Sequence, residues 1–211
     1  MAIRNILSTD DPSLKKNSRV VTDFNKRLHT LLDDMRETLV EANGLGLAAP
    51  QVGVLRRAVL VVDINMDDEE PDDAVEIEAP MVADGLARAE ESGSDEDPEG
   101  QDETEGYEEQ IIELINPEIV AMSGEQEGSE GCLSLPGVYG LVKRPDLVKV
   151  KAQDRYGNPF ELWGKKLTAR ALCHEIDHLN GVIFTSLAER LLSKEEIEQM
   201  SAEREQQEEE I

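Results

Sequence analysis

The chain has 211 residues, a length typical of one domain with a sizeable core. It carries 47 acidic against 21 basic side chains, a net charge of −26 at pH 7. So acidic a chain is a poor candidate for nucleic-acid binding, because attraction to phosphate needs clustered lysine and arginine. The sequence has no run of about 18 apolar residues and no signal peptide, so we expect a cytoplasmic protein without a membrane partner.

The excess negative charge is concentrated in two segments. Residues 67–109 hold 20 acidic residues against Arg88, and residues 195–210 hold 8 against Arg204. The rest of the chain has 19 acidic and 19 basic residues and is formally neutral. Residues 67–109 are too polar to offset chain entropy by burial, which predicts a flexible acidic insertion. We therefore predict one domain over residues 1–190, interrupted by 67–109, and an acidic helical tail over 191–211.

The first expected element is an amphipathic helix over residues 22–43. Apolar residues recur there every three or four positions, with Thr22 as the expected N-cap and Gly44 as the expected stop. The next stretch, GLGLAAPQVG, is too rich in glycine and small residues for a helix. Residues 58–64 then have the β-branched composition of a buried strand.

Strand patterns resume after the acidic segment, and a second main helix follows them. The expected strands are 111–115, 118–122, 146–153 and 160–163. The second main helix is expected over 167–179, and Ser193 is the expected N-cap of a C-terminal helix. This order predicts an α+β fold, with a mostly antiparallel sheet packed around a central helix and with an N-terminal and a C-terminal helix.

The central helix carries the clearest chemical signal, His174-Glu175-Ile176-Asp177-His178. Histidines four residues apart on a helix stand one above the other, so both imidazoles can bind one metal ion. Glu175 lies beside them around the helix, where a general base for a metal-bound water belongs. The alternative is an exposed helix with two unliganded histidines, but a chain with only 3 histidines rarely has this spacing by chance.

A metal site with two histidines needs a third protein ligand. The long zinc-protease motif would have a histidine six residues after His178, but Phe184 occupies that position. Cys132, in the sequence EGCLS, is the better candidate because thiolates bind iron and zinc strongly; the alternative is a small buried hydrophobic residue. Cys173 is interpreted as a packing residue, since the neighbour of a helical ligand points about 100° away from it.

Residues 44–51, GLGLAAPQ, form the third motif. A nucleotide-binding loop does not fit, because it would need a preceding strand and a following helix. The small residues would instead let backbone lie against a substrate, with Gln51 offering an amide donor.

In this order, GLGLAAPQ, EGCLS and HEIDH resemble the three motifs of peptide deformylase. That bacterial and organellar metallohydrolase removes the formyl group from the N-terminal methionine of new proteins. The resemblance covers residues 1–190 apart from the acidic segment and implies one catalytic domain there. It implies that Cys132, His174 and His178 hold one divalent metal ion, with Fe²⁺ expected and Zn²⁺, Ni²⁺ or Co²⁺ accepted.

The resemblance also implies the roles of other residues. Glu175 is the general base and acid for attack by a metal-bound hydroxide, while Gln51 and the N–H of Leu133 donate to the formyl oxygen. Substrate contacts come from the backbone of three residues: Leu45, Gly46 and Gly131. The implied partners are N-formylmethionyl nascent peptides, made at the ribosome. Electrostatic docking on the ribosome through the tail is not expected, because residues 195–210 carry −7.

Other residues near the motifs have candidate supporting roles. Arg144 and Asp177 are either a pair that orients the metal-binding helix or two surface charges, and Glu130 is a candidate brace for a ligand histidine. The helix face near Ala171 and Leu172 is expected to help form the pocket for the methionine side chain.

Two other functions remain open from the residues alone. One is a zinc peptidase of the HExxH type, which shares the histidines and Glu175 and needs no role for Cys132. The other is a non-enzymatic acidic interaction module on a deformylase-like scaffold.

Overall fold

The computed structural model describes residues 2–64, 110–197 and 199. The predicted acidic insertion over 67–109 and most of the predicted tail over 191–211 lie outside the described residues. None of the described helices is long and apolar enough to cross a membrane.

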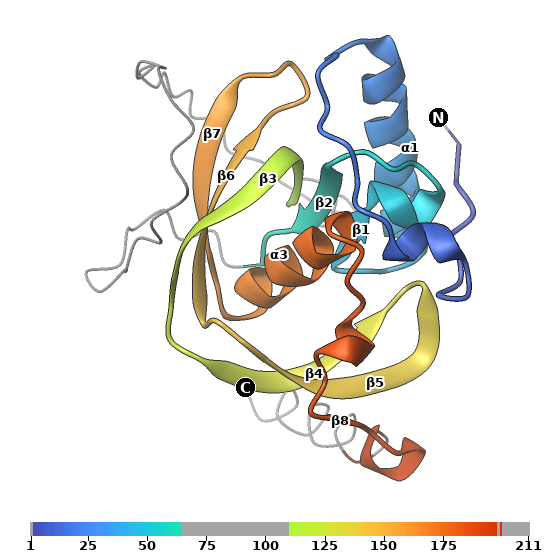
Figure 1. Cartoon of the computed structure of the whole chain (residues 1–211), viewed down its shortest axis with the longest axis vertical. Coiled ribbons are helices and arrows are strands. Elements are labelled where there is room, and N and C mark those ends of the chain that lie inside the picture. The colour runs from blue at the N-terminus through green and yellow to red at the C-terminus, as the bar shows by residue number, and fades with distance from the viewer. Residues whose placement is uncertain (1, 65–109, 198, 200–211) are drawn as a thin grey trace, which may run out of the picture.

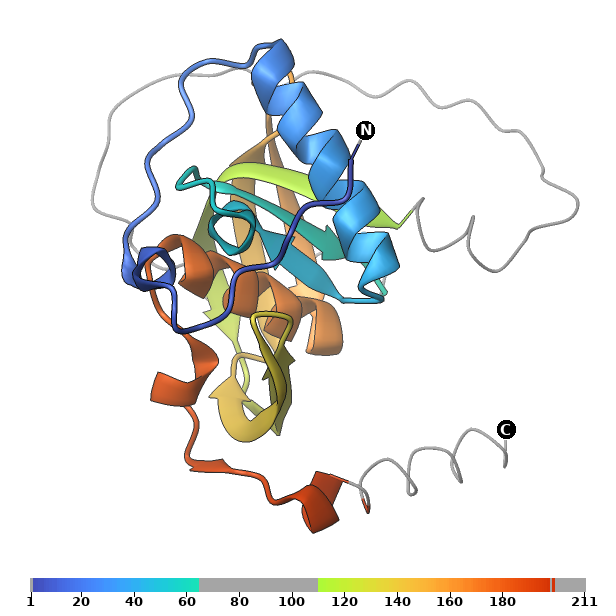
Figure 2. The ribbon, with the colours of Figure 1, turned by 90° about the vertical axis from the view of Figure 1, so that its right-hand side faces the viewer.

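Helix α1 (Lys26–Glu41) forms the first layer, over the end of the sheet made by β1 and β2 (Figures 1 and 2). Its buried apolar residues lie on the face that meets the sheet, as the periodicity predicts. The predicted N-cap Thr22 is wrong: Asn25 caps the helix and accepts hydrogen bonds from the N–H groups of Arg27 (2.9 Å) and Leu28 (3.4 Å). Both residue types cap helices well, so local sequence did not distinguish them.

Two antiparallel sheets form the body of the described chain. The larger has the order β1-β2-β3-β6-β7, and its strands are β1 (Gly46–Ala48), β2 (Ala58–Val62), β3 (Ile111–Ser123), β6 (Leu147–Gln153) and β7 (Pro159–Lys165). The smaller has the order β4-β5-β8, and its strands are β4 (Gln126–Cys132), β5 (Leu135–Arg144) and β8 (Arg190–Leu191). The predicted α+β class with antiparallel pairing is confirmed.

The strand predictions were incomplete in two ways. The segments 111–115 and 118–122 are one strand, β3, whose pairing with β6 shifts register between Ile115 and Glu118. Strands β1, β4, β5 and β8 were not predicted. The sequence of β4, QEGSEGC, has no β-branched or aromatic residue, so it gave no strand signal.

Helix α3 (Lys166–Leu179) lies at the centre, between the larger sheet and the β4–β5 hairpin (Figure 1). Its bounds agree with the predicted 167–179 to within a residue. The short 3₁₀ helix η2 (Ala49–Val52) follows β1 and faces the same region. At the described end of the chain, the predicted N-cap Ser193 is confirmed, since its hydroxyl accepts from the N–H of Glu196 at 3.3 Å.

Candidate active site

Three side chains that can bind a metal ion meet between α3 and the end of β4. One ligand atom from each of Cys132, His174 and His178 lies within 4.8 Å of the other two. The Cys132 Sγ is 3.3 Å from the Nε2 of His178, and the two imidazole centroids are 4.9 Å apart. The i, i+4 spacing on α3 places the imidazoles one above the other in an edge-to-face arrangement, and the end of β4 places the thiol beside them.

The chemistry of these donors fits a divalent metal ion. One thiolate and two imidazoles are a donor set that suits zinc or ferrous iron. Imidazole binds metals in its neutral form, and burial lowers the pKa of His178 to about 3. Burial also lowers the pKa of His174, but hydrogen bonds with Cys132 and Glu130 outweigh burial and raise it to about 10, so metal binding at His174 would displace a proton. His174 directs its Nδ1 to the Oε2 of Glu130 at 3.0 Å, which leaves Nε2 available as a ligand atom.

Glu130 is a buried carboxylate that joins this histidine to two arginines. Arg144 donates to both carboxylate oxygens, at 2.8 and 3.0 Å, and Arg170 donates to Oε1 at 3.0 Å. Burial raises the pKa of Glu130, but hydrogen bonds from His174 and Arg144 outweigh burial and lower the pKa to about 2. Arg144 also donates to Asp177 at 2.7 Å, so these two residues are a pair and not separate surface charges.

Glu175 is buried on the side of α3 that faces β1. It is 4% exposed, and its Oε2 has no hydrogen-bond partner among the described residues. Burial raises the pKa of Glu175 to about 7, a value suited to accepting and returning a proton near neutral pH. Gly46 makes room for this carboxylate, because a Cβ at position 46 would lie 2.5 Å from the Glu175 Oε1.

Gln51 reaches the same centre from η2. Its Oε1 accepts from the N–H of Ala48 at 2.8 Å, and its Nε2 donates to the Ser134 hydroxyl at 3.3 Å. The same Nε2 is 3.5 Å from the Cys132 Sγ. The amide is therefore held with its donor side toward the candidate metal ligands.

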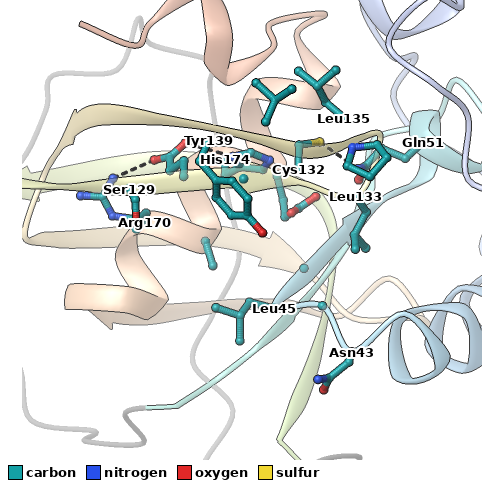
Figure 3. A pocket seen from close by; sticks show the side chains of 18 of the residues that line it. Asn43, Leu45, Gln51, Ser129, Cys132, Leu133, Leu135, Tyr139, Arg170 and His174 are labelled. Carbon is teal, nitrogen blue, oxygen red and sulfur yellow. Dashed lines mark hydrogen bonds and ion pairs between the residues drawn. The ribbon is translucent and has the colours of Figure 1, made fainter. Parts of the chain in front are cut away.

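A cavity of about 620 Å³ opens beside these residues (Figure 3). Figure 3 shows Asn43 and Leu45 on one side of it and Tyr139, Cys132 and His174 on the other. Of the predicted site residues, His178 is buried beside Cys132 and does not line the cavity. The others line it: Leu45, Gly46, Gln51, Gly131, Cys132, Leu133, His174 and Glu175. Segments far apart in the sequence are thus brought to one place.

The helix face near Ala171 and Leu172 was expected to help form the methionine pocket, which stays a prediction, and the two residues differ in their position. Ala171 lines the cavity, but Leu172 is 1% exposed and packs in the core against the larger sheet. The cavity also has lining residues that sequence reasoning missed, among them Tyr139 and Arg170. Arg170 had a signal, because it lies four residues before His174 on the same face of the helix.

The other cysteine, Cys173, is a packing residue, as predicted. It is 5% exposed within the core cluster between α3 and the larger sheet. Burial raises the pKa of its thiol to about 11, which keeps the thiol protonated at neutral pH.

A family profile described as polypeptide deformylase matches residues 3–194. The chain belongs to this family. It is 45% identical over 199 residues to the peptide deformylase of Caldicellulosiruptor bescii, covering 94% of this chain and 93% of that protein. It is 46% identical over 185 residues to the peptide deformylase of Alkaliphilus metalliredigens, covering 88% of this chain and 96% of that protein.

Solved deformylase structures have the same fold. The peptide deformylase of Legionella pneumophila superposes with a TM-score of 0.65 at 38% identity, over 96% of this chain and 92% of that one. The peptide deformylase of Thermotoga maritima superposes with a TM-score of 0.67 at 27% identity, over 90% of this chain and 100% of that one. Polypeptide deformylases are metal-dependent hydrolases that remove N-formyl groups from nascent peptides, and this is the activity of the chain.

Proposed function

We propose that the chain deformylates N-terminal formyl-methionine with Cys132, His174 and His178 as metal ligands and Glu175 as the proton carrier. The observation that supports this proposal is that Gln51, Cys132, His174 and Glu175 line one cavity, with His178 in contact with Cys132. Their three segments, 44–51, 130–134 and 174–178, are separated by long stretches of sequence, and one cavity wall includes residues of each.

A divalent metal ion held by these ligands would lower the pKa of a bound water and polarise the formyl group. Glu175 takes the proton from the attacking water as the new C–O bond forms on the formyl carbon. The C–N bond then breaks, and Glu175 returns the proton to the leaving amine. The products are formate and a peptide with a free amino group. A carboxyl group with a pKa of about 7 can serve in both directions.

The negative charge that develops on the formyl oxygen needs hydrogen-bond donors. The Nε2 of Gln51 and the N–H of Leu133 fill this role, and each such donor typically contributes about 10²- to 10³-fold in rate. The backbone of Leu45, Gly46 and Gly131 contacts the peptide. Both glycines make room for neighbouring side chains, because a Cβ at position 46 would lie 2.5 Å from the Glu175 Oε1 and one at position 131 would lie 2.8 Å from the ring of Tyr139.

The remaining features of the proposal follow from composition and from the resemblance to the deformylase family. Ferrous iron is the proposed native ion, and zinc, nickel and cobalt are the expected substitutes. Residues 1–190 are one catalytic domain that residues 67–109 interrupt, and residues 191–211 are an appended tail. The enzyme acts in the cytoplasm on chains at the ribosome, without electrostatic docking through its acidic tail.

Replacing the thiol ligand tests the site against a zinc peptidase with the same two histidines. Loss of a residue that hydrogen-bonds to a metal ligand typically weakens metal binding by about 10- to 100-fold. Cys132→Ala removes a proposed ligand itself, so we expect a larger loss of metal affinity. Cys173→Ala is the matched control, because its thiol lies in the core and should leave affinity unchanged. Anaerobic purification with metal analysis measures both, and a Cys132→Ala protein that keeps its metal would favour the peptidase.

An assay on formyl-methionine peptides separates the enzyme from the non-enzymatic interaction module. We expect the anaerobically purified wild-type chain to release formate and to leave internal peptide bonds intact. A folded, metal-loaded wild-type chain that releases no formate would contradict the proposed function.

A further inference from the structure

Helix α3 is attached to the two sheets by different kinds of contact. Toward the larger sheet it contributes Ala169, Leu172 and Ile176 to a buried apolar cluster with β2, β3 and β6. The apolar cluster beside the smaller sheet, around Val142 and Phe184, has no α3 residue among its described members. The attachment of α3 to β4 and β5 therefore depends mainly on polar side chains.

Arg170 is the α3 side chain with the most contacts to the smaller sheet. It is 6% exposed, and it precedes His174 by four residues and His178 by eight, so it extends the row of metal ligands by one turn. Its guanidinium donates to four acceptors: Glu130 Oε1 (3.0 Å) and the carbonyls of Val142 (3.0 Å), Gly128 (3.3 Å) and Gln126 (3.3 Å). One side chain thus joins α3 to both β4 and β5.

The position of Glu130 connects Arg170 to the metal ligands. Its Oε1 accepts from Arg170 and its Oε2 contacts His174, so the carboxylate spans one turn of the helix. Cys132 follows two residues later on the same strand. Two of the proposed ligands are therefore on α3 and the third is on β4, and Arg170 fixes the helix against that strand.

We propose that Arg170 is a positioning residue for the metal centre, which holds the imidazoles of α3 at binding distance from the thiolate of β4. The proposal rests on the ligands assigned under the proposed function. Arg170 need not contact the metal ion, because it acts through Glu130 and through the backbone of β4 and β5. Its loss should lower metal affinity more than it alters substrate binding.

The test is a competition titration of Co²⁺ against a chelator, with the thiolate-to-cobalt absorption as a second readout. We expect Arg170→Met to weaken Co²⁺ binding by about 10- to 100-fold and to reduce that absorption. Arg170→Lys should recover part of the affinity, because lysine keeps a charged donor for Glu130 but cannot reach both strands. Arg155→Met is the matched control, since Arg155 binds the carboxylates of Asp33 and Glu113 away from the site.

Two outcomes would overturn the proposal: a folded Arg170→Met protein with Co²⁺ affinity within about twofold of wild type, or an equal loss in Arg155→Met. If Arg170→Met does not fold, Gly128→Ala takes its place, because the added Cβ would lie 3.0 Å from the Arg170 Nη2 and shift the guanidinium by a few tenths of an ångström. Wild-type affinity in both Gly128→Ala and Arg170→Lys would then overturn it. The titration measures metal binding, so it can fail or succeed independently of formate release.

Discussion

The two faces of α3 differ in how they are held and in what they do. The face toward β2, β3 and β6 of the larger sheet is apolar, with Leu172 and Ile176 buried in a core cluster. The opposite face contacts β4 through Arg170 and His174, which both bind Glu130 of that strand. Burial of apolar surface stabilises the fold without demanding one geometry, whereas hydrogen bonds fix atoms in place. Substitutions on the apolar face should therefore mainly lower the free energy of unfolding, and substitutions at the proposed site should mainly lower metal binding or catalytic rate.

The largest effect is expected at Glu175, the proposed proton carrier. Glu175→Gln keeps the size of the side chain but cannot accept the proton, so we expect kcat to fall by about 10²- to 10⁴-fold. Metal content and unfolding free energy should stay near wild type. Formate release and metal analysis on the same preparation provide the test, and a variant with wild-type kcat would exclude Glu175 as the proton carrier.

The apolar face should show the reverse pattern. Leu172→Ala removes a side chain that is 1% exposed, and we expect a loss of about 2–5 kcal/mol in the free energy of unfolding. At a temperature where the variant remains folded, kcat/KM should be close to wild type. Denaturant unfolding gives the first quantity, with Leu187→Ala as a control because Leu187 is 44% exposed. A loss of activity without a loss of stability would contradict the separation of the two faces.

The smallest effect is expected at a charged contact far from α3, on helix α1. Asp34 accepts hydrogen bonds from the N–H of Ala2 (2.8 Å) and from Arg4 (3.1 and 2.9 Å). Burial raises the pKa of Asp34, but these hydrogen bonds outweigh burial and lower it. A lowered folded-state pKa adds stability above the unfolded-state pKa, about 3.9, and that stability is lost as pH falls through the lowered value.

We therefore expect Asp34→Asn to cost on the order of 1 kcal/mol at pH 7 and progressively less in acid. Unfolding of wild type and variant at several pH values measures the difference. The kcat of the variant should not change, since Asp34 does not line the cavity. A stability difference that grows toward acid would show that the sign of this linkage is wrong.

The sequence predicted the helices better than the smaller sheet, for a physical reason. Periodic apolar residues located α1 and α3, because a helix that packs on a sheet must bury one face. Strand β4 consists of glycine, serine, glutamine, glutamate and cysteine, and its conformation comes from pairing with β5. Pairing between strands is a tertiary contact, so local composition did not reveal it.

The candidate site was predictable in its reactive groups and less so in its supports. His174 and His178 are identified by spacing, and Cys132 by the chemistry of its thiol. The pairing of Arg144 with Asp177 was one of two alternatives until the structure gave their distance. Arg170 was missed because three of its acceptors are backbone carbonyls. Every residue has such a carbonyl, so the sequence does not indicate which ones accept a hydrogen bond.

Gly46 shows that a site can depend on the absence of atoms. The backbone of β1 passes so close to Glu175 that a methyl group at position 46 would occupy the place of its carboxylate. In a saturation scan, this position would rank with the reactive residues, although it has no functional group of its own. Its contribution is a volume of empty space, and a search of the chain for nucleophiles, acids and ligands would overlook it.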